Sequence, residues 1–497
     1  MVRRTLLASV CSVLVLALSA IGSSPKTLDR APAAGGDRVL ERSGGESGEA
    51  TEARFEALRL ARESGNFGAD AASTATTVTN PAPGWVGSQL LNPDTDDWEP
   101  AVATDPNAPY VYILTTRYGQ PKTCSSHCPS PYLALTVSQD GGRSWGAQVP
   151  LWGAKGSNAQ YDPTIEVVPD TGDVYAAFLN ADKAAGFSTV FMRSTNHGET
   201  WTAPVHTYEK GWTDKPEVTT SADGSDVYVS WNGQTGGDLW VGVSHDYGAT
   251  WSPERLTNSK RYYYAYDGKV LPDGTVIFSE SSVVYANSAG GNGKATGTYF
   301  HHAIISRDGG ATWENHVLDK VSLGPPCVSD GCYAEFHTGQ TSVSTDANGD
   351  LVYAYEGAST DGEPQRVYVT TSSDEGLTWS DRTALSLKRE DATAPRLAAT
   401  DDGDVRLWYM QTSDGGVGTS WNVWYRSSTD GGDHWSAPVK ISDADPGTTG
   451  YITANGFDEI YGDYGEIGIT NVGKTIAVWG EGFSYNGPGG TWFNIQS

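Results

Sequence analysis

One eight-residue pattern occurs six times in this chain of 497 residues, and no other feature constrains the fold as strongly. The copies are SQDGGRSW (138–145), STNHGETW (194–201), SHDYGATW (244–251), SRDGGATW (306–313), SSDEGLTW (372–379) and STDGGDHW (428–435). In each copy an Asp or Asn can accept backbone N–H bonds across a turn, and a glycine permits positive φ. Successive copies start 56, 50, 62, 66 and 56 residues apart. This spacing indicates repeated units of several strands rather than single hairpins.

Each unit carries four short segments that are typical of β-strands. A first segment such as APRLAATDD precedes a tight turn, and an alternating second segment follows, such as YVYILTT or DVYVSW. A third segment leads into the repeated turn, and a fourth leaves it, as in WTAPVHT and WSAPVKI. Four antiparallel strands per unit, repeated in a ring, form a β-propeller. The predicted fold class is therefore all-β, with the propeller spanning residues 81–497.

Six turns suggest six blades, but a seventh unit begins after the last turn. It contains YGDYGEIGIT, the strand TIAVWGE and the terminal GTWFNIQS, and it has no fourth strand. The segment GWVGSQLLN (84–92) resembles HWSAPVKIS, which follows the sixth turn. A strand from the N-terminal side would close the ring and leave no open sheet edge. We therefore favour seven blades, with six as the alternative.

The repeated turn resembles the Asp-box, the S-x-D-x-G-x-[ST]-W signature of sialidases and related propellers. The resemblance covers residues 81–497 and implies that the turns lie on the face opposite the active site. Sialidases also carry three arginines that hold the substrate carboxylate, a Tyr nucleophile paired with Glu, and an Asp acid/base. Their first arginine stands in an F/Y-R-I-P motif, which this sequence lacks. The resemblance therefore implies a glycan-acting propeller more firmly than it implies a sialidase.

The N-terminal residues predict export. Arg3 and Arg4 precede the apolar run LLASVCSVLVLALSA, and small residues follow, as in a secretory signal peptide over residues 1–23. The apolar run is too short to span a membrane. Residues 24–80 are rich in Ala, Gly, Ser, Thr and charge, which predicts a mostly disordered linker or propeptide. We expect a secreted, extracellular and monomeric mature protein.

Four cysteines remain after the predicted signal peptide, and an oxidising compartment favours their pairing. Sequence alone allows three connectivities. Short separations favour Cys124–Cys128 and Cys327–Cys332 as two local disulfides. A zinc site at Cys128 beside His127 is the alternative, although the spacing differs from common zinc modules.

The net charge of −27 excludes whole classes of partner. Nucleic acid and anionic membranes do not attract a polyanion. Many carboxylates are compatible with structural calcium, but no twelve-residue calcium loop is present. We expect no cofactor and no catalytic metal, and an extracellular glycan as the partner.

Candidate site residues follow from the topology. With the turns on one face, the opposite mouth is built by loops that lead into each first strand and loops that leave each second strand. Glycoside hydrolysis needs two carboxylates, or a Tyr nucleophile activated by one. The predicted catalytic residues at this mouth are Tyr461, Asp463, Tyr464, Asp162 and Asp267. The predicted substrate-binding residues are Arg117, Arg396, Lys215 and His337.

Two observations keep other interpretations open. Asp before Pro, as in YDP, is also typical of an Asx turn that only fixes a loop. The sequence predicts a secreted glycoside hydrolase, with acidic sugars as the first substrates to test, whereas a non-catalytic carbohydrate- or protein-binding propeller is the alternative. A polysaccharide lyase is the third hypothesis, with His337 and Arg396 near a uronate carboxylate.

Overall fold

The computed structural model describes residues 81–92, 97–117, 129–152, 157–182, 186–208, 213–233, 237–285, 295–324, 339–413, 421–443, 464–482 and 489–497. All of them belong to one compact unit, Ala33–Ser497. The predicted signal peptide (1–23) and linker (24–80) lie outside the described residues. Within the described ranges, no helix is long and apolar enough to cross a bilayer.

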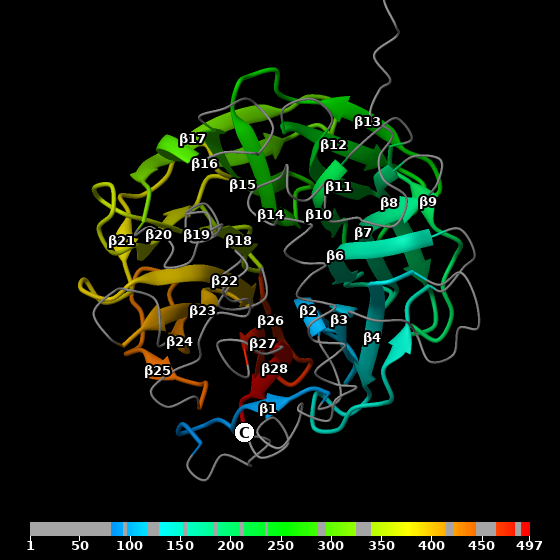
Figure 1. Ribbon diagram of the computed structural model, residues 1–497, viewed down its shortest axis with the longest axis horizontal. Helices are drawn as coiled ribbons and strands as arrows, with labels where there is room; N and C mark the ends of the chain where they lie inside the picture. Colours follow the sequence, from blue (N-terminus) through cyan, green and yellow to red (C-terminus); the bar gives the residue numbers. More distant parts are fainter. Residues whose placement is uncertain are drawn as a thin grey trace, which may run out of the picture. The chain divides into compact units, whose positions relative to one another are not determined.

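The described strands form seven antiparallel sheets of four strands each (Figure 1). Blade 1 contains β2 (Asp97–Thr104), β3 (Val111–Arg117), β4 (Tyr132–Ser138) and β5 (Val149–Pro150). Blade 2 contains β6 (Ser157–Val167), β7 (Val174–Asp182), β8 (Gly186–Ser194) and β9 (Val205–His206). Blade 3 contains β10 (Thr213–Thr220), β11 (Val227–Gly233), β12 (Asp238–Ser244) and β13 (Ser252–Arg255). Blade 4 contains β14 (Tyr262–Val270), β15 (Val276–Tyr285), β16 (Ala295–Ser306) and β17 (Glu314–Ser322).

The remaining three blades follow the same order. Blade 5 contains β18 (Thr341–Thr345), β19 (Leu351–Gly357), β20 (Arg366–Ser372) and β21 (Thr383–Ala384). Blade 6 contains β22 (Ala392–Thr400), β23 (Asp404–Thr412), β24 (Trp421–Ser428) and β25 (Val439–Lys440). Blade 7 contains β26 (Glu466–Ile469), β27 (Thr475–Gly482), β28 (Gly489–Ile495) and β1 (Gln89–Leu90). The predicted seven-bladed propeller is confirmed.

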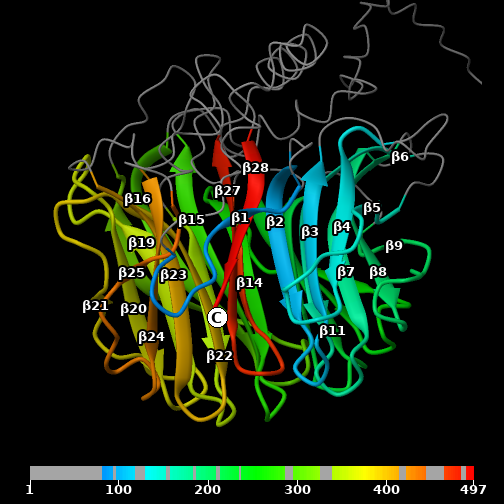
Figure 2. The ribbon, with the colours of Figure 1, turned by 90° about the horizontal axis from the view of Figure 1, so that it is seen from below.

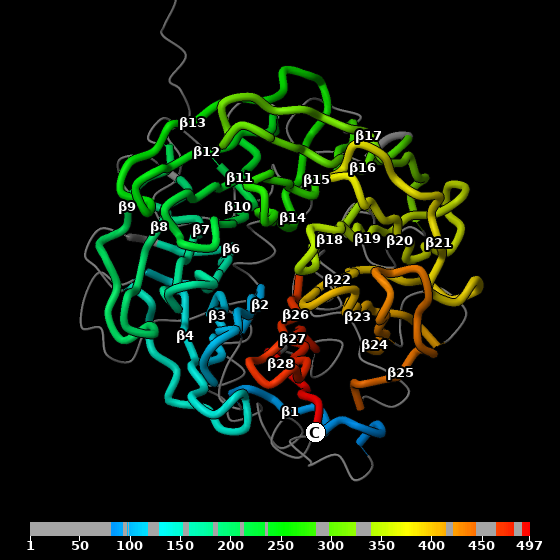
Figure 3. Tube along the Cα trace, turned by 180° about the vertical axis from the view of Figure 1, so that it is seen from behind, coloured from blue at the N-terminus to red at the C-terminus, as the bar shows by residue number. Residues whose placement is uncertain are grey.

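The ring closes with a strand from the N-terminal side, as the sequence predicts. β1 pairs with β28 in antiparallel register, with Gln89 opposite Phe493 and Leu90 opposite Trp492. An isolated bridge between Trp85 and Gln496 extends this pairing. The innermost strands contact one another in sequence order, and β26 of the last blade contacts β2 of the first (Figure 3). The seventh sheet therefore combines segments about 400 residues apart, and its fourth strand covers the edge of β28.

The six repeated turns join the third and fourth strands and hold themselves together with side-chain hydrogen bonds. In the first copy, Ser138 Oγ donates to Asp140 Oδ1 at 2.9 Å and accepts the Gly142 N–H at 2.8 Å. The Ser144 N–H also donates to Asp140 Oδ1, at 2.8 Å. The corresponding acceptors in the other copies are Asn196, Asp246, Asp308, Asp374 and Asp430.

Each turn also packs against the preceding blade. The Trp145 ring meets Phe493 of blade 7 edge-on at 5.3 Å, and Trp251 meets Phe191 of blade 2 at the same distance. The glycine is required for the same contact, since a Cβ on Gly248 would lie 2.0 Å from the Phe191 ring. These contacts give the turns an architectural role.

The antiparallel order creates two distinct faces, seen side-on in Figure 2. The turn face carries the six repeated turns and the connections between first and second strands. The mouth face carries the connections between second and third strands and those from one blade to the next. Because every innermost strand runs from the mouth face to the turn face, residue order along these strands gives depth along the axis.

Candidate functional site

Four innermost strands share a backbone irregularity close to the mouth face. Glu99, Asp162, Lys215 and Ala394 each precede a proline and adopt φ between 48° and 54°. The register of β2, β6, β10 and β22 shifts at these residues, as in β-bulges. A bulge leaves one residue out of the ladder and re-aims its side chain. Asp162 in YDP is thus part of a bulge within the strand.

The bulges bring together what we call the mouth cluster, composed of Glu99, Asp162, Lys215 and Tyr464. Tyr464 Oη donates to Asp162 Oδ1 at 3.2 Å, and Lys215 Nζ lies 3.4 Å from the same oxygen. Lys215 Nζ also lies 5.1 Å from the centroid of the Tyr464 ring. Three of the predicted site residues, from blades 2, 3 and 7, are therefore in direct contact.

Glu99 of blade 1 supports this arrangement from below the Asp162 backbone. Its Oε2 accepts the Asp162 N–H at 2.8 Å and the Thr116 hydroxyl at 2.5 Å. The bulge that carries Asp162 has a left-handed backbone, which a non-glycine residue adopts at a cost in free energy. The Glu99 side chain offsets part of that cost by accepting the Asp162 N–H.

Burial and charge act in opposite directions on Asp162, which is 1% exposed. Burial disfavours the carboxylate, but the Lys215 ammonium and hydrogen bonds with the side chains of Glu99, Asp214 and Tyr464 outweigh it and hold the pKa of Asp162 below its usual value. Lys215 is itself 9% exposed. The cluster thus contains an ionised carboxylate that can accept a proton from Tyr464.

Asp267 lies deeper along the axis than the mouth cluster. It follows the bulge of β14 and pairs with Lys269 Nζ at 2.9 Å. Ser342 Oγ of the next blade donates to Asp267 Oδ2 at 2.7 Å, and the Val343 N–H donates to it at 3.3 Å. Asp267 therefore joins blades 4 and 5 and faces a lower part of the channel.

The two predicted binding arginines that the structure describes hold other parts of the protein. Arg396 is buried and donates to the carbonyl oxygens of Gly465 and Thr341, at 2.6 and 3.1 Å. Arg117 ends β3 and donates to Gln148, which precedes the outer strand β5. These contacts join blades or lie toward the rim, so both arginines differ in surroundings from Lys215.

Seven other predicted residues belong to segments outside the part of the chain that the structure describes. Tyr461, Asp463 and His337 lie outside the described residues, as do all four cysteines of the predicted disulfides, Cys124, Cys128, Cys327 and Cys332. Their roles remain predictions.

Four buried carboxyl groups stay protonated more readily than usual, three of them on second strands and one, Asp391, directly before β22. Burial raises the pKa of Glu481 to about 8 and that of Asp391 to about 7. Burial also raises the pKa of Glu280 and Glu356 well above the ordinary range. Glu356 Oε2 accepts the N–H of Ala394 in the next blade at 2.5 Å. Glu356 thus supports the bulge of blade 6 in the way that Glu99 supports the bulge of blade 2.

Sequence reasoning singled out the bulge residues but not the groups beneath them. Glu217 and Glu466 stand two residues after Lys215 and Tyr464, and Lys269 stands two residues after Asp267. They line the channel below the mouth cluster. The available signal was their offset of two residues from a predicted site residue. Within the described ranges, no group of three or more His, Cys, Asp and Glu side chains is arranged to hold a metal ion.

No protein-family model matches the chain, and no curated protein matches its sequence. Similar solved structures include a protein of unknown function from Dyadobacter fermentans DSM 18053, with 16% identity and a TM-score of 0.47 over 83% of this chain and 99% of that chain. An ulvan lyase from a new polysaccharide lyase family has 14% identity and a TM-score of 0.49, over 80% and 94%. The NanB sialidase from Streptococcus pneumoniae has 13% identity and a TM-score of 0.42, over 86% and 72%. The assignment of the fold rests on the strand topology and not on these matches.

Proposed function

We propose that this propeller is a secreted glycoside hydrolase that cleaves an extracellular glycan containing acidic sugars. The observation that carries the proposal is the hydrogen bond from Tyr464 Oη to Asp162 Oδ1 at 3.2 Å, beside the Lys215 ammonium. A tyrosine paired with a carboxylate can act as a nucleophile toward an anomeric carbon, because the carboxylate takes the phenolic proton. The low pKa of Asp162 keeps this acceptor ionised at neutral pH.

In the proposed step one bond forms at the anomeric carbon as another breaks. Tyr464 Oη forms a bond to the anomeric carbon while the bond from that carbon to the leaving oxygen breaks. The Tyr464 proton passes to Asp162, and the leaving oxygen takes a proton from Asp463, another residue of the predicted catalytic set. Water then attacks the anomeric carbon, releases Tyr464 and restores both protonation states. Lys215 stabilises negative charge on the tyrosine oxygen and attracts a sugar carboxylate.

A polysaccharide lyase is the second candidate, and the same lysine favours it. Elimination needs a base that removes the proton next to a uronate carboxylate, and a cation that neutralises this carboxylate. Tyr464, with its proton held by Asp162, and the adjacent Lys215 provide these two groups. The products distinguish the reactions, because only a lyase forms an unsaturated sugar that absorbs in the ultraviolet.

The test is a screen of acidic glycans with the mature protein, read out by reducing ends and by ultraviolet absorbance. On a substrate that is turned over, Tyr464→Phe and Asp162→Asn should each lower kcat/KM at least about a hundredfold, the scale of a lost acid/base group. Tyr247→Phe is the matched control, since Tyr247 is exposed on a repeated turn. Full turnover in Tyr464→Phe contradicts the assignment, and glycan binding without products indicates a binding propeller.

A further inference from the structure

A cavity lies on the propeller axis beneath the mouth cluster. Its volume is about 250 Å³, and the innermost strands of all seven blades line it. Pro106 and Pro169, from connections on the turn face, also contribute to its wall. The cavity therefore extends toward the face opposite the mouth, and its occupancy is independent of the function proposed above.

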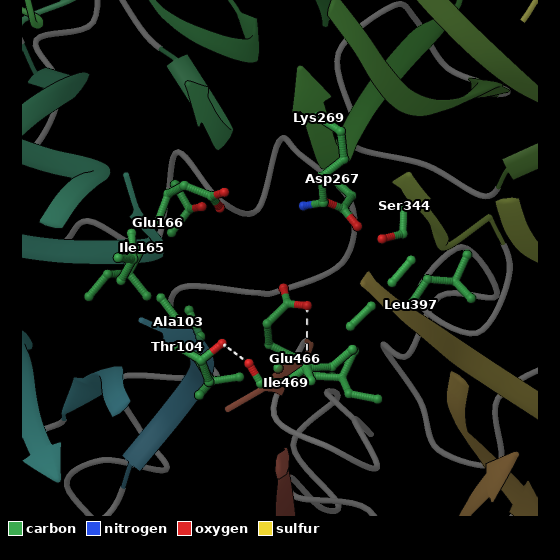
Figure 4. Close-up of a pocket in the computed structure, with 18 of the residues that line it drawn as sticks. Ala103, Thr104, Ile165, Glu166, Asp267, Lys269, Ser344, Leu397, Glu466 and Ile469 are labelled. Carbon is green, nitrogen blue, oxygen red and sulfur yellow. Dashed lines mark hydrogen bonds and ion pairs between the residues drawn. The ribbon is translucent and has the colours of Figure 1, made fainter. Parts of the chain in front are cut away.

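Charged groups from four blades face this cavity. Figure 4 shows Glu166, Asp267, Lys269 and Glu466 pointing toward a common space, and Glu217 belongs to the same lining. Asp267 is paired with Lys269 at 2.9 Å, so three carboxyl groups remain in excess. The rest of the wall is largely apolar, with Ile165, Val167, Leu397, Ile467 and Ile469. The cavity thus combines excess negative charge with apolar walls.

Ser344 gives an independent indication that this space suits a ligand with a hydrogen-bond donor. Its side chain is 2% exposed and lines the cavity, where its oxygen points inward (Figure 4). Among the described residues, its hydroxyl has no hydrogen-bond partner within bonding distance. A buried hydroxyl without a partner costs free energy unless a bound group or water satisfies it.

The excess carboxyl groups hold protons when the cavity contains no counter-ion. Burial, together with the nearby charge of Asp267, raises the pKa of Glu166 to about 6 and that of Glu466 to about 7. Burial together with Asp267 and Glu466 raises the pKa of Glu217 well above its ordinary value. Lys269 and the guanidinium of Arg396 oppose these shifts without cancelling them. A bound cation would replace these protons.

We propose that this axial cavity binds a small organic cation, a primary ammonium on a short apolar body, with Glu217 and Glu466 as counter-ions. Ser344 Oγ accepts a hydrogen bond from the ammonium, and the apolar walls contact the carbon chain. A bare metal ion fits less well, because no metal-binding group is arranged within the described ranges. The cavity has the volume of roughly eight water molecules, which suits a chain of about six non-hydrogen atoms.

Titration calorimetry with 1,4-diaminobutane tests the proposal on the full mature protein. We expect saturable binding at one site that tightens between about pH 5 and pH 8, because ionised carboxylates bind the cation and protons compete with it. Glu466→Gln should weaken binding at least about tenfold, since it removes a buried counter-charge. Ser344→Ala should weaken it by a smaller factor.

Controls separate a built site from general attraction to a polyanion. Glu254→Gln removes a carboxylate from the exposed strand β13 and should leave binding unchanged. 1,4-Butanediol, which lacks charge, should not bind. Thermal unfolding checks that Glu466→Gln folds, which we expect because the amide mimics the protonated acid. No saturable binding at pH 8, equal binding of the diol, equal weakening by Glu254→Gln, or binding of calcium in place of the diamine overturns the proposal.

Discussion

At the scale of single residues, this propeller buries many aspartate and glutamate side chains. Asp162 remains ionised because Lys215 lies beside it, whereas Glu481 has no cation among its described contacts. Glu481 Oε1 accepts the Trp479 Nε1–H at 2.7 Å, and burial raises its pKa to about 8. The difference between the two acids is the neighbouring charge, which decides whether a buried carboxyl can release its proton.

The raised pKa of Glu481 predicts a pH-dependent stability. A carboxyl group whose pKa is higher in the folded state than in the unfolded state contributes its full stabilisation at pH values below its unfolded pKa of 4.5. This contribution is lost as pH rises toward about 8. Glu481→Gln should therefore match the wild type near pH 5 and exceed its free energy of unfolding by on the order of 2 kcal/mol near pH 8. Urea unfolding at both values checks this, and a constant difference between variant and wild type would contradict it.

At the scale of the element, the repeated turn combines hydrogen bonds within eight residues with a contact to the preceding blade. The internal hydrogen bonds require Ser and either Asp or Asn, and the contact requires Gly. The two requirements explain why the pattern is written nearly unchanged six times while the strands around it vary. A turn that lost its glycine would keep its hydrogen bonds and lose its contact with the preceding blade.

Two glycines at adjacent positions of the repeated turn separate these effects, Gly248 at the fifth position of its copy and Gly431 at the fourth position of the last copy. Gly248 has φ of 79°, and an added Cβ would lie 2.0 Å from Phe191, whereas Gly431 has φ of 69° and no atom within 4 Å of such a Cβ. Gly431→Ala should cost only the backbone strain, about 1–2 kcal/mol. Gly248→Ala adds a steric clash and should cost more than about 3 kcal/mol in total. Denaturant unfolding of both variants measures the difference, and equal losses would show that strain alone explains the glycine.

The same element explains what the sequence can and cannot predict. The turns and the alternating strands are local patterns, so blades, faces and the closing segment 84–92 follow from them. The site depends on bulges. Each bulge shifts the alternation of side chains along its strand by one residue, and this changes which side chains face the channel. Asp162 and Asp267 therefore have similar sequence surroundings. In the structure Asp162 contacts Tyr464, whereas Asp267 contacts Lys269 farther from the mouth face. For the same reason, the sequence does not distinguish Glu217 and Glu466 from other residues of the innermost strands.

At the scale of the whole molecule, the ring of blades closes in blade 7, where β1 pairs with β28; we call this junction the seam. Three strands of this blade come from the C-terminal end, and β1 comes from residues 89–90. Trp85, which is 5% exposed, extends the seam and packs edge-on against Tyr425 of blade 6 at 4.9 Å. The seam thus joins β1 to its own blade by backbone hydrogen bonds and to the adjacent blade by an aromatic contact.

Removing the seam should open the ring. A protein that begins at Pro81 keeps Trp85 and β1, whereas one that begins at Pro93 loses both and exposes the edge of β28. We expect the shorter protein to aggregate through this edge and to unfold more easily, since losing a buried Trp alone costs about 3–5 kcal/mol. Trp85→Ala in the longer protein should reproduce the loss of stability but not the aggregation. Val86→Ala, at a side chain that is 48% exposed, should change stability by less than about 0.5 kcal/mol. Size-exclusion chromatography and urea unfolding measure the two effects, and equal behaviour of the two truncated proteins would show that the ring closes without β1.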